Sequence, residues 1–361
     1  MVAGARTVEA EQPAERAPRV ARKPPRVAAG SGQMRSATLA LRTPTTALPL
    51  VTLEQTASRA RAYADAAKAP NTRRAYRSDW NDFLRWCRGR RRTALAATPD
   101  TVALYLTELA SVCKVSTLQR RLTSIGQAHQ AAGYAAHESP TKHVTVRAVW
   151  AGIRRAHGTA QEGKAPTLIE DVRAMVATLP DTLLGVRDRA LLLLGFAGAF
   201  RRSELVGLDV RDVMVTRAGL VVRLRRSKTD QEGEGQTVGI PYGSNPETCP
   251  VRAVQEWLEC ANIKEGPLLR SVNRHEQLQQ ARLSDKTVAL VVKRMAAAAG
   301  LDATLYAGHS LRAGLATAAA IAGTSERAIM KQTRHRSERM VRKYIRDGEL
   351  FRNNAAATVG L

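Results

Sequence analysis

Hydrophobic residues between positions 52 and 155 recur every three or four residues, a spacing typical of amphipathic helices. Tyr76, Trp80, Phe83 and Cys87 follow spacings of four, three and four, which places them on one face of a helix. The neighbouring arginines fall largely on the other faces. We therefore expect one side of this helix to pack into a core and the other to be basic.

Capping residues predict where these helices begin. The predicted starts are the capping box of Thr52 and Gln55, then Asn71, Asp100, and Ser116 or Thr117. A fifth helix is predicted through Val146–Ile153, again from the spacing of apolar residues. The first folded region is thus a set of short helices.

The stretch His157–Ala165 is polar, contains glycine, lacks periodicity and ends at Pro166, which is typical of an interdomain linker. A second domain is predicted to begin there. Thr167 and Glu170 repeat the capping-box spacing, and the apolar run Ala190–Ala197 predicts a buried helix.

The pattern changes to strands between Asp209 and Pro241. Three strands are predicted, at Val213–Thr216, Leu220–Arg225 and Thr237–Ile240, and they form a small antiparallel sheet. Helical periodicity then returns in five segments: Pro250–Ala261, Ser284–Ala298, His309–Ala322, Ser325–Gln332 and Met340–Asp347. The fold class is mostly α with this small sheet.

Charge narrows the choice of partner. The chain has 56 Lys and Arg against 32 Asp and Glu, a formal net charge of +24, which favours a polyanion such as nucleic acid. A coding bias toward arginine and alanine is the other explanation. Residues 1–50 contain many prolines and alanines without apolar periodicity, so we expect a disordered basic tail.

Other compositional features exclude several classes of protein. Cys87, Cys113, Cys249 and Cys260 have neither zinc-site spacing nor the density of a disulfide scaffold, so reduced thiols are expected. Neither a signal peptide nor a long apolar span is present, which predicts a soluble, cytoplasmic protein. The sequence has no GxxxxGK[ST] or HExxH motif, so neither a metal nor another cofactor is predicted.

Candidate chemistry comes from two motifs in the second domain. AFRRSEL places Arg201 directly after the apolar helix and Glu204 one turn later. GHSLRAG sets His309 and Arg312 three residues apart on one helix face, where both side chains can reach a single anion. Each motif alone is also compatible with a purely structural role.

A third motif, RHRSERMVRKY, places His335 nine residues before Tyr344. Together the motifs resemble the tyrosine recombinase (phage integrase) family, whose catalytic domain has Arg, Lys, His-x-x-Arg, His or Trp, and Tyr in that order. The matching positions here are Arg201, Lys228, His309, Arg312, His335 and Tyr344.

The resemblance extends from about Leu53 to the C-terminus, because NTRRAYRSDWNDFLRWC looks like the family's core-binding domain. It implies a helical core-binding (SAM-like) domain at 51–157 and an α+β catalytic domain at 167–361, joined by the linker at 158–166, while the tail expected to be disordered at 1–50 lies outside the resemblance. Two residues depart from the motifs: Phe200 replaces the usual leucine, and Arg334 replaces the glycine that commonly precedes the second histidine. Neither is expected to touch a catalytic group, although Arg334 removes a flexible position beside His335.

The family chemistry assigns each residue a role. Arg201 and Arg312 would clamp the phosphate, since guanidinium binds two oxygens and stays protonated. Tyr344 would attack and form a 3′-phosphotyrosine, with His309 or His335 as proton acceptor. Lys228 would protonate the 5′ oxygen, His335 would mainly hydrogen-bond the phosphate, and Glu204 would orient Arg201 or a histidine.

The partner implied is double-stranded DNA with inverted-repeat core sites, bound by a homotetramer on paired sites, with accessory DNA-bending proteins as further candidates. DNA contacts are expected from the N-terminal helices, through Thr72, Arg73, Thr117, Arg120 and Arg121. A solvated basic face explains these five residues nearly as well. The expected location is bacterial cytoplasm, at the nucleoid, and no membrane is involved.

The resulting function is site-specific recombination through a Holliday junction, in integration, excision or resolution of a mobile element or replicon. Two alternatives remain open: a type IB topoisomerase-like enzyme, and a noncatalytic DNA-binding regulator with the same fold. The segment after Tyr344, which includes Leu350 and Phe351, has enough apolar surface to dock on a neighbouring subunit, and this favours the recombinase.

Overall fold

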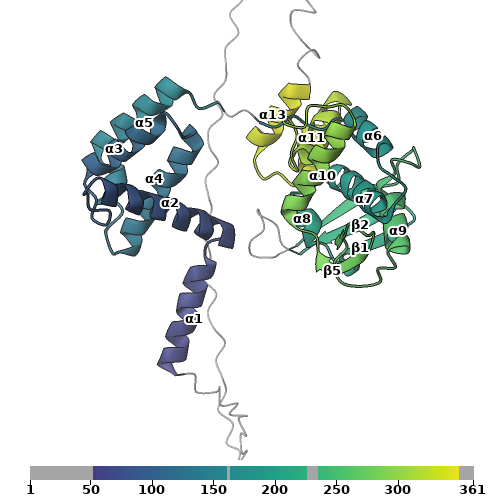
Figure 1. Cartoon of the computed structure of the whole chain (residues 1–361), viewed down its shortest axis with the longest axis horizontal. Coiled ribbons are helices and arrows are strands. Elements are labelled where there is room, and N and C mark those ends of the chain that lie inside the picture. Colours follow the sequence, from purple (N-terminus) through teal and green to yellow (C-terminus); the bar gives the residue numbers. More distant parts are fainter. Residues whose placement is uncertain (1–51, 161–162, 226–234, 349–361) are drawn as a thin grey trace, which may run out of the picture. The chain divides into compact units, whose positions relative to one another are not determined.

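The computed structural model describes residues 52–160, 163–225 and 235–348 (Figure 1). Packing divides the chain into Met1–Ala64 and Asp65–Leu361. Helix α1 (Leu53–Ala66) begins at the predicted capping box: Gln55 N donates to Thr52 Oγ1 at 3.2 Å, and Thr52 N donates to Gln55 Oε1 at 3.0 Å. Within the described ranges, no helix combines the length and apolarity needed to cross a membrane. The predicted tail at 1–50 lies outside the described residues.

Four further helices share one hydrophobic core in the N-terminal part of the chain. They are α2 (Pro70–Gly89), α3 (Pro99–Ala110), α4 (Val115–Ala131) and α5 (Val144–His157), with a 3-10 turn at Pro140–Lys142. Phe83 and Cys87 are buried and Tyr76 and Trp80 are half-buried, so the predicted apolar face of α2 is confirmed.

Three predicted helix starts were displaced by one or two residues. Helix α2 begins at Pro70, so Asn71 lies in its first turn and is not the cap. Thr98 caps α3 in place of Asp100, and α4 begins at Val115. A proline fits the first helical position because its φ is already helical and its missing N–H is not needed there. At α2 and α3 this preference outweighed the capping tendency of the later polar residue.

The second part of the chain starts with helix α6 (Ile169–Ala177), where the predicted capping box is shifted by one residue. Asp171 Oδ2 accepts a hydrogen bond from Leu168 N at 3.0 Å, in the place expected for Glu170 and Thr167. The other helices are α7 (Leu183–Ala197), α8 (Arg202–Gly207), α9 (Pro250–Cys260), α10 (Asp285–Ala298), α11 (Ser310–Ile321), α12 (Glu326–Thr333) and α13 (Glu338–Gly348).

The predicted sheet is confirmed. Strands β1 (Val213–Thr216), β2 (Gly219–Leu224) and β3 (Gln236–Pro241) are antiparallel in the order β1-β2-β3, after a 3-10 turn at Val210–Asp212. Gly219 has φ 142°, and a Cβ there would lie 2.1 Å from Ile240 O, so this turn requires glycine.

A second hairpin, β4 (Arg270–Val272) with β5 (Leu278–Arg282), was not predicted. Its second strand has one half-buried leucine at its start and then four exposed residues, three of them polar, so it lacks the alternation that marks a half-buried strand. The strand β5 is therefore defined by its pairing with β4 and not by a pattern in its own sequence.

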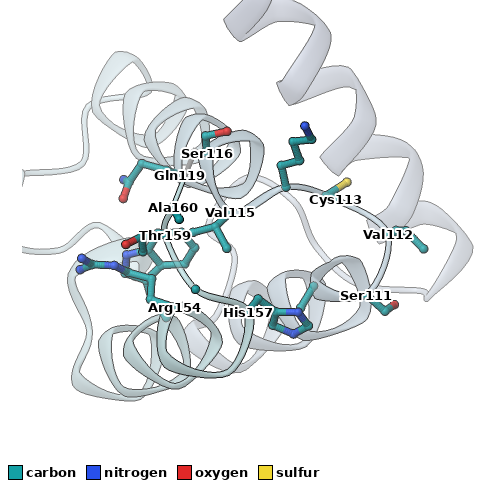
Figure 2. Close-up of a pocket in the computed structure, with 14 residues that line it drawn as sticks. Ser111, Val112, Cys113, Val115, Ser116, Gln119, Arg154, His157, Thr159 and Ala160 are labelled. Atoms are coloured by element: carbon teal, nitrogen blue, oxygen red, sulfur yellow. The ribbon is translucent and has the colours of Figure 1, made fainter. Parts of the chain in front are cut away.

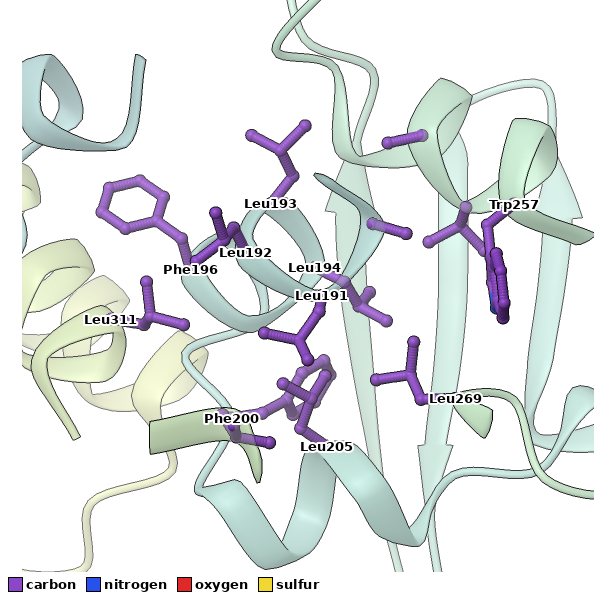
Figure 3. Close-up of a cluster of buried hydrophobic side chains, with 14 of the residues drawn as sticks. Leu191, Leu192, Leu193, Leu194, Phe196, Phe200, Leu205, Trp257, Leu269 and Leu311 are labelled. Atoms are coloured by element: carbon purple, nitrogen blue, oxygen red, sulfur yellow. The ribbon is translucent and has the colours of Figure 1, made fainter. Parts of the chain in front are cut away.

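The hydrophobic core of this second part surrounds α7, which is buried along most of its length (Figure 3). Leu191 and Leu194 of α7 belong to the same buried cluster as Leu205, Trp257 and Leu269 from other elements. Because the second half of α7, Ala190–Ala197, is apolar on every side, it is held from several sides, and the loop that follows it has a fixed position.

Candidate active site

The loop after α7 carries Arg201 at a defined angle. Ala199 has φ 45°, a left-handed conformation that turns the chain between α7 and α8. Arg201 then precedes α8, and its backbone N donates to Glu204 Oε2 at 2.9 Å. Its side-chain Nη1 donates to Glu204 Oε1 at 2.5 Å. Glu204 therefore fixes both the backbone and the guanidinium of Arg201.

Glu204 is almost fully buried yet stays ionised. Burial would raise the pKa of its carboxyl, but the hydrogen bond from Arg201 N and the charges of Arg334 and Arg201 outweigh burial and lower the pKa. An acceptor with a fixed negative charge can hold two guanidinium groups at once.

Arg312 lies on the first turn of α11 and is completely buried. Its Nη1 donates to Ala199 O at 2.7 Å, so it meets the loop that carries Arg201. Burial and the nearby charges of Arg201 and Arg334 lower the pKa of Arg312 to about 9, which leaves the group protonated at neutral pH. The structure thus brings together two arginines that are far apart in the sequence.

Packing between α13 and α11 positions Tyr344 in this site. Tyr344 and Val341 of α13 belong to a small buried cluster with Ala313, Ala316 and Ala320 of α11. The Tyr344 hydroxyl lies 3.1 Å from His309 Nε2. Small alanine side chains let the two helices approach closely, and this sets the position of the hydroxyl group.

His335 lies between α12 and α13, with its ring centroid 5.8 Å from that of Tyr344. Burial, followed by the charges of Arg312 and Arg201, lowers the pKa of His335 to about 3, so the imidazole is neutral. His335 Nδ1 lies 2.7 Å from Thr333 Oγ1, and the Thr333 hydroxyl donates to Ile329 O at 2.7 Å. Since that hydroxyl has one hydrogen, Nδ1 must carry the proton and Nε2 has a free lone pair.

Arg334 contacts Glu204, the residue expected to orient Arg201. Arg334 Nη2 donates to Glu204 Oε2 at 3.1 Å, on the carboxylate that also binds Arg201. Spacing could not reveal this contact, because 130 residues separate the partners. The only sequence signal was an arginine in place of the usual glycine.

Comparison with known proteins identifies the family. The phage integrase family model matches residues 166–349, and the model for the phage integrase N-terminal SAM-like domain matches residues 63–133. An integrase/recombinase XerD homolog from Selenomonas ruminantium is 44% identical over 303 residues, which cover 84% of this chain and 89% of that protein. The chain belongs to the phage integrase family. It is a tyrosine-type site-specific recombinase of the XerC/XerD/integrase kind.

Solved integrase and recombinase structures share the fold. XerH site-specific recombinase bound to palindromic difH substrate, in a post-cleavage complex, matches with TM-score 0.56 and 16% identity, over 73% of this chain and 72% of that chain. A lambda integrase dimer bound to a COC′ core site matches with TM-score 0.55 and 18% identity, over 84% and 79%. The predicted fold class is therefore confirmed.

Two predicted features of this integrase cannot be placed. Lys228 lies in residues 226–234, between β2 and β3, outside the described residues. The apolar segment that includes Leu350 and Phe351 also lies outside them. Of the predicted catalytic set, the structure brings together Arg201, Arg312, His309, His335 and Tyr344, with Glu204 beside them.

The predicted DNA-contact residues of the integrase lie on α2 and α4, and both arginines of α4 are in ion pairs. Arg120 makes a two-point ion pair with buried Asp79, at 2.7 and 3.0 Å, although its side chain is 48% exposed. Arg121 donates to Asp82 Oδ1 at 2.6 Å and to the Tyr105 hydroxyl at 2.9 Å, and its side chain is 15% exposed. Arg120 is thus the more accessible of the two.

A cavity of about 930 Å³ lies in the helical region, and none of the predicted catalytic residues lines it (Figure 2). The end of α3, the start of α4 and the end of α5 line it, with Gln119, Trp150, Arg154 and His157 among its side chains. Across the described ranges, no cluster of three His, Cys, Asp or Glu side chains could hold a metal ion.

Proposed function

We propose that this recombinase cleaves DNA by attack of the Tyr344 hydroxyl on a backbone phosphate, which yields a 3′-phosphotyrosine and a free 5′-hydroxyl. The observation that carries the proposal is the Tyr344–His309 contact beside Arg312. The Tyr344 side chain is also close enough to influence the pKa of Arg312. A nucleophile, a proton acceptor and a buried cation therefore share one site.

The two arginines would bind the phosphate. Arg312 Nη2 is buried and has no hydrogen-bond partner among the described residues, so it is a donor that a phosphate oxygen would satisfy. Arg201 keeps its guanidinium fixed through Glu204 and can present its other nitrogens to a second oxygen. Because the pentacoordinate transition state carries more charge on its oxygens than the ground state, fixed cations lower the barrier.

The reaction needs two proton transfers, one from the attacking tyrosine hydroxyl and one to the departing 5′ oxygen. A tyrosine hydroxyl with a pKa of about 10 must lose its proton on attack, and His309 Nε2 is the acceptor that lies against it. Lys228 is assigned as the general acid for the 5′ oxygen by resemblance to the family. His335 Nε2 would accept a proton and then donate to the phosphate, since an added phosphate charge raises the pKa of the imidazole.

The reaction conserves bond energy, because one phosphoester is exchanged for another. Attack by a 5′-hydroxyl on the phosphotyrosine reverses cleavage and reseals the strand. No ATP is needed, and nothing in the proposed steps requires a metal or cofactor. Exchange between two DNA sites would pass through a Holliday junction.

The substrate we propose is duplex DNA, which two domains grip: a helical domain at 51–157 and a catalytic domain at 167–361, joined by the linker 158–166. The net charge of +24 and the DNA-bound state of the XerH and lambda integrase structures support it. Four copies would hold two inverted-repeat sites, with accessory bending proteins where needed. The protein would act in the bacterial cytoplasm, at the nucleoid, on a mobile element or replicon.

The decisive test is a suicide substrate, a duplex nicked near the cleavage site so that the released 5′ end diffuses away. The DNA flanking the gene supplies candidate sites, and covalent complexes are detected as bands that survive SDS. We expect a covalent band with the unmodified chain, none with Tyr344→Phe, and an undiminished band with Tyr242→Phe, a control at an exposed tyrosine.

Two results would favour the alternatives. Binding of a site without any covalent band would favour a noncatalytic regulator. Covalent cleavage with relaxation of supercoiled DNA, but without strand exchange between two sites, would favour the topoisomerase-like enzyme.

A further inference from the structure

Arg334 is buried at the centre of the site, although no step of the proposed reaction uses it. Its side chain is 5% exposed and makes four hydrogen bonds. Nη1 donates to Gly198 O and Gln332 O, both at 2.8 Å, and Nη2 donates to Ala199 O at 2.9 Å and Glu204 Oε2 at 3.1 Å. One guanidinium thus joins the end of α12 to the loop after α7.

These contacts reach both catalytic arginines. Glu204 Oε2 accepts from Arg334 and from the backbone N of Arg201, while Glu204 Oε1 binds the Arg201 side chain. Ala199 O accepts from Arg334 Nη2 and from Arg312 Nη1. Arg334 therefore shares one acceptor group with each of the two arginines of the proposed clamp.

This arrangement has two energetic costs, backbone strain and the burial of a charge. Arg334 has φ 57° and ψ 40°, a left-handed conformation that glycine adopts more readily. Its guanidinium is also buried: burial lowers the pKa of Arg334, the charge of Arg201 lowers it further, and Glu204 opposes both. A residue that combines backbone strain with a buried charge persists only where the surrounding contacts hold it.

Phe200, the other residue that departs from the family motifs, packs against Arg334. The Arg334 Cζ lies 5.1 Å from the centroid of the Phe200 ring. Phe200 is 1% exposed, and a Cβ on Gly198 would lie 2.1 Å from this ring, so the loop has no space for a larger residue there. An aromatic face stabilises a cation through its quadrupole, which a leucine could not do.

We propose that Arg334 is a positioning residue that locks the His335 segment onto the loop of Arg201 and sets the spacing of Arg201 and Arg312. This inference rests on the proposed function of those two arginines. Such a residue acts through preorganisation, so its loss should slow the chemical step and leave DNA affinity nearly unchanged.

The test compares Arg334→Gly and Arg334→Lys with the unmodified chain. Glycine relieves the left-handed strain and so preserves folding, whereas lysine keeps the charge and loses the planar fork. Single-turnover cleavage of the suicide substrate, DNA affinity and Tm are measured for each. Arg327→Ala, at an exposed arginine of α12, the helix that Arg334 follows, is the matched control.

We expect Arg334→Gly to slow cleavage at least tenfold with less than a threefold change in Kd, Arg334→Lys to fall between, and Arg327→Ala to be unchanged. Combined with Glu204→Gln, the Arg334→Gly loss should not add, because both act through one carboxylate.

A cleavage rate within twofold of the unmodified chain, or a loss that matches the decrease in folded protein, would overturn this inference alone. Full additivity with Glu204→Gln would overturn it too. A covalent band that survives Tyr344→Phe would overturn the proposed nucleophile instead, so the two failures are distinguishable.

Discussion

His309 Nε2 lies 3.1 Å from the Tyr344 hydroxyl oxygen, although 35 residues separate them in the chain. His309 directly precedes α11, and Tyr344 lies on α13, which packs against the alanines of α11. Packing between the two helices therefore holds the proposed nucleophile within hydrogen-bonding distance of its proposed proton acceptor before any DNA is bound.

Substitution of His309 by alanine should slow cleavage roughly a hundredfold, as expected for loss of a general base. The lost rate should recover in part as pH approaches the tyrosine pKa of about 10, because the hydroxyl then ionises without help. Single-turnover rates from pH 6 to 9 test this. His275→Ala, at an exposed histidine, is the control. A His309→Ala profile parallel to that of the unmodified chain would contradict the role.

Removal of Arg312 should cost about a hundredfold or more in cleavage rate, the effect of losing one preorganised donor. DNA affinity should change little, because most phosphate contacts lie elsewhere. Cleavage and binding are measured for Arg312→Ala, with the exposed Arg252→Ala as control. An equal loss of both quantities would indicate a role in binding and not in the transition state.

The free energy of unfolding should decrease as pH falls from about 7 to 4, in part because of His335. Its pKa in the folded chain is about 3, so below about 6.5 the unfolded state binds a proton that the folded state does not. Urea unfolding at several pH values should show a shallower decrease for His335→Asn. An equally steep decrease in the variant would show that His335 does not contribute.

Phe200 and Arg334 should be coupled in stability. In a double-mutant cycle of Phe200→Leu and Arg334→Gly, we expect a coupling free energy of about 1 kcal/mol, typical of a partly desolvated cation over a ring. The Tm or the urea midpoint of the four proteins gives the value. Strict additivity would show that the ring face contributes nothing.

Arg120 and Arg121 should differ when each is replaced by alanine. Arg121→Ala should lower the free energy of unfolding by about 1–3 kcal/mol, since Asp82 and the Tyr105 hydroxyl each lose one hydrogen bond in a partly buried cluster. Arg120, with the more exposed side chain, is the better phosphate ligand, and its loss should reduce the salt slope of DNA binding by about one. A loss of stability in Arg120→Ala together with a smaller salt slope in Arg121→Ala would instead make Arg121 the phosphate ligand and Arg120 the structural residue.

Local patterns in the sequence were sufficient for much of the fold. Strands β1 to β3 and most helices were predicted. Apolar residues recur every two residues in a half-buried strand and every three or four residues in a helix, and this spacing is visible within a single element. The β4–β5 hairpin was missed, since its polar strand exists only through pairing with its neighbour. Helix starts at Pro70 and Pro99 were misplaced because the residues nearby offered competing caps.

The candidate catalytic residue types and their order were determined by the sequence alone, because short motifs carry them: AFRRSEL, GHSLRAG and RHRSERMVRKY. Only the tertiary structure decided which histidine contacts Tyr344, which tautomer His335 adopts and that Arg334 binds Glu204. Those properties depend on distances between elements far apart in the chain. A charge or hydrogen bond acts over a few ångströms of space, and no spacing along the sequence encodes that proximity.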